Sequence, residues 1–162
     1  RKEVIQPPLG LDLDTVGVLF DLSKRTAAFE KHWAADVEDQ GIDPKENALE
    51  LEGLLVGFRT ALLNAYEDTF LAEGEIIGTH TSPHARTILF YDNFPGGIGV
   101  TSAIFEDRKG RLFKRARERV ECCACVYPSG CVKCVLPRFS SRETPVKKDQ
   151  VRAFLEWLLE NR

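Results

Sequence analysis

All of the cysteines of this chain lie in one short stretch, and that stretch constrains the fold more than any other feature. Five cysteines fall within the run Cys122-Cys123-Ala124-Cys125-Val126-Tyr127-Pro128-Ser129-Gly130-Cys131-Val132-Lys133-Cys134. Zinc binds four thiolates tetrahedrally, and two close cysteine pairs on tight turns supply such a site. Cys131 and Cys134 form one pair, and either Cys123 with Cys125 or Cys122 with Cys125 forms the other. The spacing predicts a metal site, and an all-sulfur site with no open position is structural rather than catalytic.

Disulfide bonds are the main alternative use of these cysteines. An odd number leaves one thiol unpaired, and the first residues show no apolar segment typical of a secretory signal. A chain of 162 residues also buries enough surface to fold without disulfides. We therefore favour zinc over disulfides, with iron–sulfur ligation as a lesser alternative.

The remaining sequence predicts a mixture of helices and short strands. A buried strand is expected over 14–21, followed by a helix over 24–38 capped by Ser23. A long core helix is expected over 45–73, ended by Gly74, because apolar residues recur there every three or four positions. Strands over 76–81 and 87–91 are expected to form a hairpin. A helix is then expected over 98–121, interrupted at Gly110, and Thr144-Pro145 is expected to open a last helix that runs to about residue 160.

These elements predict one α+β domain over residues 1–162. We expect a small, mainly antiparallel sheet packed by three to four helices, with a loop stapled by zinc through four cysteines. No apolar run approaches the roughly 20 residues of a membrane span, so we expect no membrane association. The P-loop, nucleophile-elbow and His-Glu-x-x-His motifs are absent from the sequence, so we expect no enzymatic activity from this chain by itself.

A glycine-rich turn follows the second strand of the expected hairpin. Its notable residues are Asp92, Pro95, Gly96, Gly97 and Gly99. Free backbone amides in such a turn can bind an anion, such as a phosphate. A tight structural turn that needs glycine conformations is the simpler interpretation, and we favour it.

A basic segment precedes the cysteines in a chain whose net charge is −3. That net charge gives no general support for nucleic-acid binding, but charge can act locally. The segment could follow nucleic-acid phosphates, or it could be a solvated helix face with local salt bridges, and the two interpretations are equally supported. Its candidate nucleic-acid-binding residues are Arg108, Lys109, Arg111, Lys114, Arg115 and Arg117.

The order of these motifs resembles a known family. The chain begins this series with the motif Tyr91-Asp92-x-x-Pro95-Gly96-Gly97-Ile98-Gly99, which a helix follows. Next come the Cys-x-Cys and Gly130-Cys131-x-x-Cys134 pairs, and then a last helix. This arrangement is similar to the zinc-binding C-terminal domain of MrfA-type DEAD/DEAH-box mitomycin-repair helicases and their RecQ-like relatives, which also occurs in phage-defence proteins. The resemblance implies zinc ligands at Cys123, Cys125, Cys131 and Cys134, with Cys122 as the alternative to Cys123.

The resemblance also implies a function. The chain is expected to be a structural zinc-binding accessory domain of an ATP-dependent DNA helicase, with roles in nucleic-acid binding and domain stability in repair or defence. Its expected partners are DNA, single-stranded or branched, and the motor domains of a longer intracellular parent. The absence of methionine from the sequence agrees with a C-terminal fragment of such a parent. The alternative is a zinc-stapled protein–protein interaction domain of a defence or repair complex.

Overall fold

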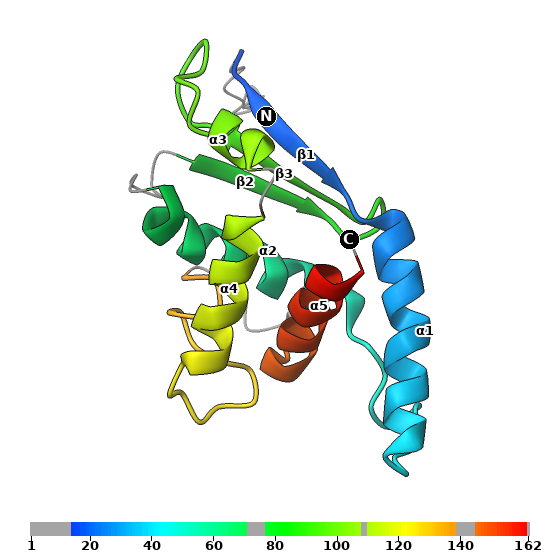
Figure 1. Ribbon diagram of the computed structural model, residues 1–162. Coiled ribbons are helices and arrows are strands. Elements are labelled where there is room, and N and C mark those ends of the chain that lie inside the picture. Colours follow the sequence, from blue (N-terminus) through cyan, green and yellow to red (C-terminus); the bar gives the residue numbers. More distant parts are fainter. Residues whose placement is uncertain (1–13, 71–76, 108–109, 139–144, 162) are drawn as a thin grey trace, which may run out of the picture.

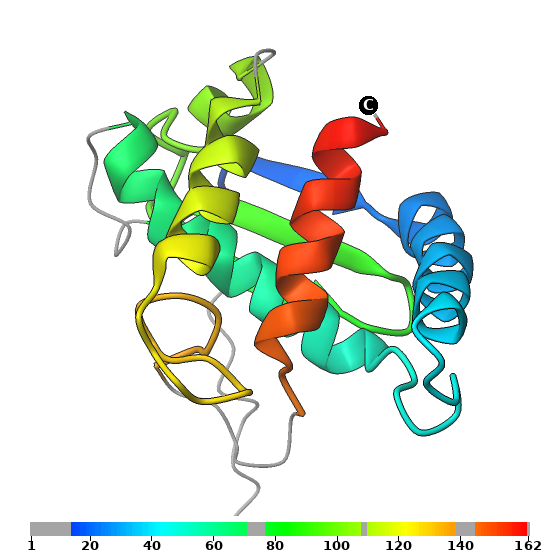
Figure 2. The ribbon, with the colours of Figure 1, turned by 60° about the horizontal axis from the view of Figure 1, so that its bottom comes forward.

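The computed structural model describes residues 14–70, 77–107, 110–138 and 145–161. It contains a three-stranded sheet with helices over one face, as Figures 1 and 2 show from two directions. The strands are β1 (Gly17–Asp21), β2 (Ile77–Ser82) and β3 (Thr87–Asp92). The helices are α1 (Ser23–Asp39), α2 (Leu51–Phe70), α3 (Ser102–Glu106), α4 (Arg111–Cys122) and α5 (Lys148–Glu160). The α+β class and the small antiparallel sheet predicted from the sequence are confirmed.

The strands pair in the order β1-β3-β2, and both pairings are antiparallel. The hairpin of β2 and β3 forms as predicted. The prediction of a buried first strand is wrong, because β1 lies at an edge of the sheet and only alternate side chains face the helices. Phe20 packs on the core, whereas the neighbouring Leu19 is 62% exposed.

The first helix begins at Ser23, so this residue is not its cap. The Ser23 side chain makes no capping hydrogen bond; instead, the Asp21 carboxylate accepts the Ser23 N–H at 2.9 Å. The last strand residue therefore supplies the acceptor that the sequence assigned to the serine.

Helix α2 begins at Leu51, later than predicted, because the chain before it is held in another conformation. The buried Gln150 of α5 donates to the Ala48 carbonyl at 3.0 Å and accepts the Glu50 N–H at 3.1 Å. Gly53 in the first turn faces the backbone at Pro145, where a Cβ would collide with the carbonyl. The predicted stop at Gly74 lies outside the described residues.

The helix predicted over 98–121 is two helices. Gly110 adopts a left-handed conformation, with φ of 62°, immediately before α4. The buried carboxylate of Asp107 accepts the Leu112 N–H at 2.9 Å and so satisfies one free amide of the α4 N-terminus. Thr144 lies outside the described residues, and α5 begins at Lys148, after Pro145.

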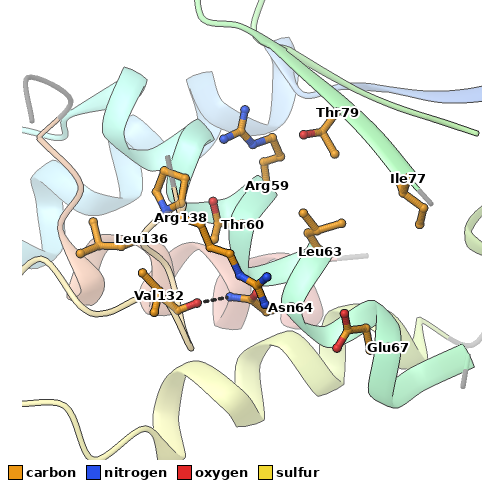
Figure 3. A pocket seen from close by; sticks show the side chains of 11 residues that line it. Arg59, Thr60, Leu63, Asn64, Glu67, Ile77, Thr79, Val132, Leu136 and Arg138 are labelled. Carbon is orange, nitrogen blue, oxygen red and sulfur yellow. Dashed lines mark hydrogen bonds between the residues drawn. The ribbon is translucent and has the colours of Figure 1, made fainter. Parts of the chain in front are cut away.

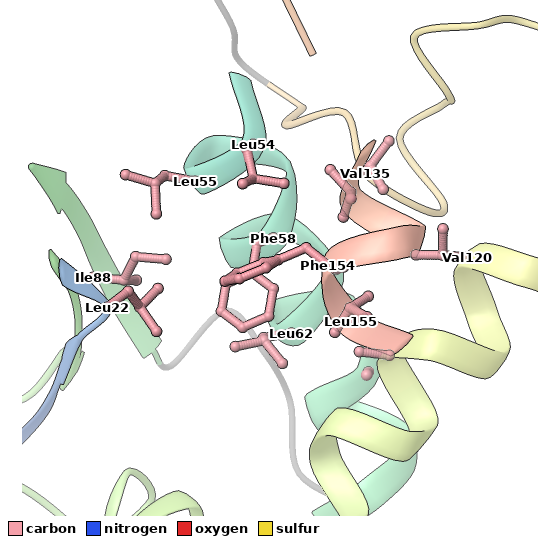
Figure 4. Packing of buried hydrophobic residues seen from close by; sticks show 14 of the residues in the cluster. Leu22, Leu54, Leu55, Phe58, Leu62, Ile88, Val120, Val135, Phe154 and Leu155 are labelled. Carbon is pink, nitrogen blue, oxygen red and sulfur yellow. The ribbon is translucent and has the colours of Figure 1, made fainter. Parts of the chain in front are cut away.

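Aromatic rings form the centre of the core between the sheet and the helices. The Phe154 ring of α5 lies 5.0 Å from the Phe29 ring and 5.1 Å from the Phe58 ring, measured between centroids. All three side chains are fully buried. Figure 4 shows Phe58 and Phe154 between the strand residue Ile88 and the helices. In the part of the chain that the structure describes, no helix has both the length and the apolar character needed to cross a membrane.

Candidate metal centre

Four cysteines converge after the end of α4. The Sγ atoms of Cys123, Cys125, Cys131 and Cys134 all lie within 4.8 Å of one another. Neighbouring sulfurs are 3.6 to 3.7 Å apart. A tetrahedron with zinc–sulfur bonds of about 2.3 Å has edges of about 3.8 Å, so the cluster has the size of a zinc–tetrathiolate site. The separations are far longer than a disulfide bond of about 2.05 Å, and all five cysteines are unbridged.

Two short segments carry the two cysteine pairs. Cys123 follows the last residue of α4, and the backbone leaves the helix there in an extended conformation. The chain then reverses at Gly130, whose φ is 78° and whose N–H donates to the Tyr127 carbonyl at 2.9 Å. A side chain at Gly130 would also meet Val135 and the Cys134 sulfur, so glycine is needed there for space as well as for conformation.

The second pair forms a tight knuckle around one carbonyl. The Cys131 carbonyl accepts the N–H groups of Cys134, Val135 and Leu136 at 3.0, 3.1 and 3.1 Å. The Cys131 N–H donates to the Cys134 sulfur at 3.1 Å. The knuckle thus presents both sulfurs to the cluster without depending on the metal for its backbone hydrogen bonds.

Cys122 lies outside this cluster. It is the last residue of α4, and its side chain is exposed, whereas Cys123 is half-buried in the group. The sequence left open which of the two adjacent cysteines joins the other pair. The structure brings Cys123 into the cluster.

Lys148 and Asn64 support the cluster from α5 and α2. The Lys148 ammonium donates to the Cys123 carbonyl at 2.9 Å and to the Cys125 sulfur at 3.5 Å. The Asn64 amide donates to the Val132 and Cys134 carbonyls at 3.1 and 3.2 Å. Sequence reasoning missed both residues, because a lysine at a helix start and an asparagine within a helix carry no pattern that points to a metal.

The thiols of the cluster differ in their acidity. A hydrogen bond from the Cys125 backbone is the main cause that lowers the pKa of Cys123 to about 7. Burial raises the pKa of Cys134 to about 12. A metal binds the thiolate form, so a cation must displace a proton from the buried Cys134. The chemistry of this donor set fits a dication held by four sulfurs.

The turn after β3 uses its amides internally. The Asp92 side chain is fully buried, and its Oδ2 accepts the N–H groups of Ile98, Gly99 and Val100 at 2.7, 2.6 and 3.1 Å. Its Oδ1 accepts the Thr101 N–H at 2.8 Å. These amides therefore bind a carboxylate of the protein rather than an external anion.

The other turn residues form the outer part of the same structure. The Gly96 N–H donates to the Asp14 carbonyl at 2.6 Å, and the Gly97 N–H donates to the Phe94 carbonyl at 3.0 Å. Gly96, Gly97 and Gly99 all have positive φ, and Pro95 is exposed beside them. This geometry is that of a structural turn.

The arginines of the basic segment are paired with carboxylates. Arg115 and Arg119 bind Asp68 of α2 at 3.1 and 2.6 Å. Arg117 binds Glu121 at 2.7 Å, and Arg111 binds Asp107 at 3.1 Å. Lys114 is exposed on the same helix, and Arg108 and Lys109 lie outside the described residues. Exposed ion pairs such as Arg117–Glu121 contribute about 0 to 1 kcal/mol each, so an exposed guanidinium group remains able to exchange its carboxylate for another anion.

Comparisons with known proteins match one family model and the fold of a solved helicase. The family model of the MrfA Zn-binding domain matches residues 58–135, from the middle of α2 to the knuckle of the second cysteine pair. A crystal structure of the DUF1998 helicase MrfA bound to DNA matches with a TM-score of 0.53 and 23% identity, covering 67% of this chain. A second one, bound to DNA and AMPPNP, matches with a TM-score of 0.51 and 24% identity over 65% of this chain.

The chain spans only 14% of the length of the matched helicase in both cases. At these identities the likeness is one of fold. Curated proteins gave no match.

Proposed function

Because residues 58–135 match the family model of the MrfA Zn-binding domain, we propose that the chain is an accessory domain of an ATP-dependent DNA helicase. Zinc, held by Cys123, Cys125, Cys131 and Cys134, supplies a structural cross-link. The observation that carries this proposal is the group of four sulfurs within 4.8 Å of one another, three of whose separations match the edges of a zinc–thiolate tetrahedron. The proposed setting is intracellular, in DNA repair or defence, where thiols stay reduced.

The cross-link fixes three helices relative to one another. Cys123 continues from the end of α4, and Asn64 attaches the second knuckle to α2. The first amide of α5, that of Lys148, donates to the Pro128 carbonyl of the cysteine loop at 2.8 Å. A bound zinc therefore sets the position of α4 against the core and holds its basic surface in one orientation.

DNA binding is the part of the proposal that concerns α4. Two observations support it: the matched helicase is bound to DNA, and α4 presents Arg111, Lys114, Arg115 and Arg117 on an exposed or half-exposed surface. Arg108 and Lys109 complete the proposed group. A DNA strand, single or branched, would replace the carboxylates with phosphates, and the motor domains of the parent would lie beside it.

Metal content and salt-dependent DNA binding test this function. We expect one zinc per chain by elemental mass spectrometry, and loss of the folded signal in a chelator. We expect weak binding to single-stranded DNA at low salt, with a salt slope that becomes shallower in the Arg115→Ala, Arg117→Ala double variant. The double variant Arg25→Ala, Lys31→Ala on α1 is a control with the same loss of charge. Iron in place of zinc, or a protein that stays folded without metal, would contradict the proposal.

A protein-interaction role is the second candidate. The cysteine loop exposes two apolar side chains between its pairs, with Val126 88% exposed and Tyr127 66% exposed. An exposed aromatic beside an exposed aliphatic residue on a rigid loop is typical of a protein contact. Absence of DNA binding at low salt, together with a partner retained by the wild type and lost by Tyr127→Ser, would favour this function.

A further inference from the structure

A cavity separates the loop that carries the cysteine cluster from the sheet, on the side of α2 that faces β2. Its volume is about 450 Å³, within the range of about 300 to 1,000 Å³ that is usual for ligand sites. Three elements form its wall: helix α2, the edge strand β2 and the segment that follows the second cysteine pair. Figure 3 shows side chains from all three around this space. Neither the metal site nor the basic surface of α4 uses it.

Polar groups converge on one side of this cavity. Arg59 and Thr60 come from α2, and Thr79 comes from β2. The Arg59 guanidinium donates to the Thr81 hydroxyl at 3.4 Å, a long hydrogen bond to a neutral group. Among the described residues, the structure gives Arg59 no carboxylate partner. Arg59 thus differs from the arginines of α4, each of which has one.

The half-buried position of Arg59 carries an electrostatic cost. Burial lowers the pKa of the Arg59 guanidinium, so its surroundings disfavour its charge. A buried or half-buried cation without a counter-ion is stabilised by any anion that can approach it. Glu67 and Arg138 also line the cavity, and each already has an interaction of its own, so Arg59 is the cation on which an external anion would depend. The polar side of the cavity is therefore suited to an anionic group such as a phosphate.

Apolar side chains line the cavity as well. Leu63, Val132, Leu136 and Pro137 line it, and Val132 is 50% exposed. Val132 lies between the ligands of the second knuckle, and Asn64 binds its carbonyl at 3.1 Å. A cavity lined by a guanidinium group and by apolar side chains matches the two parts of a nucleotide, whose phosphate is charged and whose base is flat and largely apolar on its faces.

We propose that this cavity binds one nucleotide of a single-stranded nucleic acid, with the phosphate at Arg59 and the base against Val132 and Leu136. A cavity of this size admits one nucleotide but not a base pair, so the strand must be unpaired where it enters. This inference rests on the proposed function, because it names the form of DNA that the domain contacts. It adds a surface that does not include Asp68, the residue through which α2 binds arginines of α4.

Fluorescence anisotropy of the zinc-loaded chain with a labelled oligothymidylate tests the proposal. We expect Arg59→Gln to bind roughly tenfold more weakly, because it removes a charge-assisted hydrogen bond. We also expect it to lower the salt slope by roughly one phosphate contact. Lys24→Gln on α1 removes one exposed positive charge elsewhere and should stay within about twofold of the wild type. Zinc content and circular dichroism establish that each variant is folded.

A second pair of variants tests the base contact independently. Val132→Glu places a carboxylate on the apolar wall and should abolish binding, whereas Val126→Glu adds the same charge at an exposed position of the same loop and should weaken binding much less. Unchanged affinity in both Arg59→Gln and Val132→Glu would overturn the cavity while leaving DNA binding by the domain intact. Absence of binding by the wild type would instead overturn the DNA-binding function itself. Equal competition by polyglutamate would show a site for anionic chains in general and would overturn the nucleotide assignment.

Discussion

Replacement of Asp92 by asparagine should destabilise the domain, and the cost can be worked out from its four amide contacts. An asparagine has one acceptor oxygen and one donor nitrogen in place of the two carboxylate oxygens. If the nitrogen replaces Oδ1, the Thr101 N–H is left facing another donor. If the nitrogen replaces Oδ2, three backbone N–H groups are left facing a donor. The first orientation is the less costly one. One unpaired buried donor costs about 1 to 3 kcal/mol, and the remaining bonds lose their charge assistance. We expect a loss of about 2 to 4 kcal/mol, a large part of the 5 to 15 kcal/mol typical of a domain.

Urea denaturation followed by circular dichroism measures this loss. Asp36→Asn is the matched control, because Asp36 is an exposed residue of α1 whose carboxylate accepts a hydrogen bond from the Gln40 side chain, and exposed substitutions change stability by about 0.5 kcal/mol or less. The zinc content of both variants should equal that of the wild type, since neither residue touches the cysteine cluster. A change of less than 1 kcal/mol for Asp92→Asn would refute the reasoning.

The pH dependence of stability gives a second readout for the same residue. Burial by itself would raise the pKa of Asp92, but hydrogen bonds from Thr101, Ile98 and Gly99 outweigh it and lower the pKa below the ordinary value. A carboxyl with a lowered pKa in the folded state stabilises the fold above its unfolded pKa of about 3.9. That contribution is lost as the pH falls through the folded value. The wild type should therefore lose more stability than Asp92→Asn when the pH is lowered from neutral to below 4.

Three further predictions concern the metal and the helix packing. Cys131→Ser should abolish zinc binding, whereas Cys122→Ser should keep one zinc per chain, as measured by elemental mass spectrometry. Lys148→Met should weaken zinc binding by roughly tenfold to a hundredfold in a chelator competition. Lys147→Met should not, because it is the Lys148 ammonium that donates to the Cys123 carbonyl and the Cys125 sulfur. Gly53→Ala should lower the free energy of unfolding by about 1 to 3 kcal/mol, although alanine favours helix, because its Cβ meets the backbone before α5.

The features that a regular residue spacing marks in the sequence could be predicted from it. The apolar stripe of α2 contains Leu55, Phe58 and Leu62, and all three are buried as their spacing indicates. The cysteine spacing likewise identifies the cluster, because a tetrahedral metal site needs two close pairs. In both cases the information lies within a few residues of the chain.

The parts that depend on distant contacts could not be predicted in the same way. Gln150 sets the start of α2 from a position about 100 residues further along the chain. Asp92 reaches its amides across a turn, and the sequence shows the carboxylate and the amides without showing that they bind each other. Asp21, rather than Ser23, accepts the first amide of α1. Each of these polar side chains had several local alternatives, and only the packed fold selects one.

The strand order β1-β3-β2 has a consequence for how the chain folds. The β2–β3 hairpin joins residues such as Ser82 and Thr87, whereas the β1–β3 pairing joins Gly17 to Tyr91 and must close a far longer loop. Loop closure costs more entropy as the loop lengthens, and distant contacts slow folding. We expect the hairpin to form early and β1 to complete the sheet late, so that in pulsed hydrogen exchange the amides of β3 that pair with β1 gain protection after those that pair with β2.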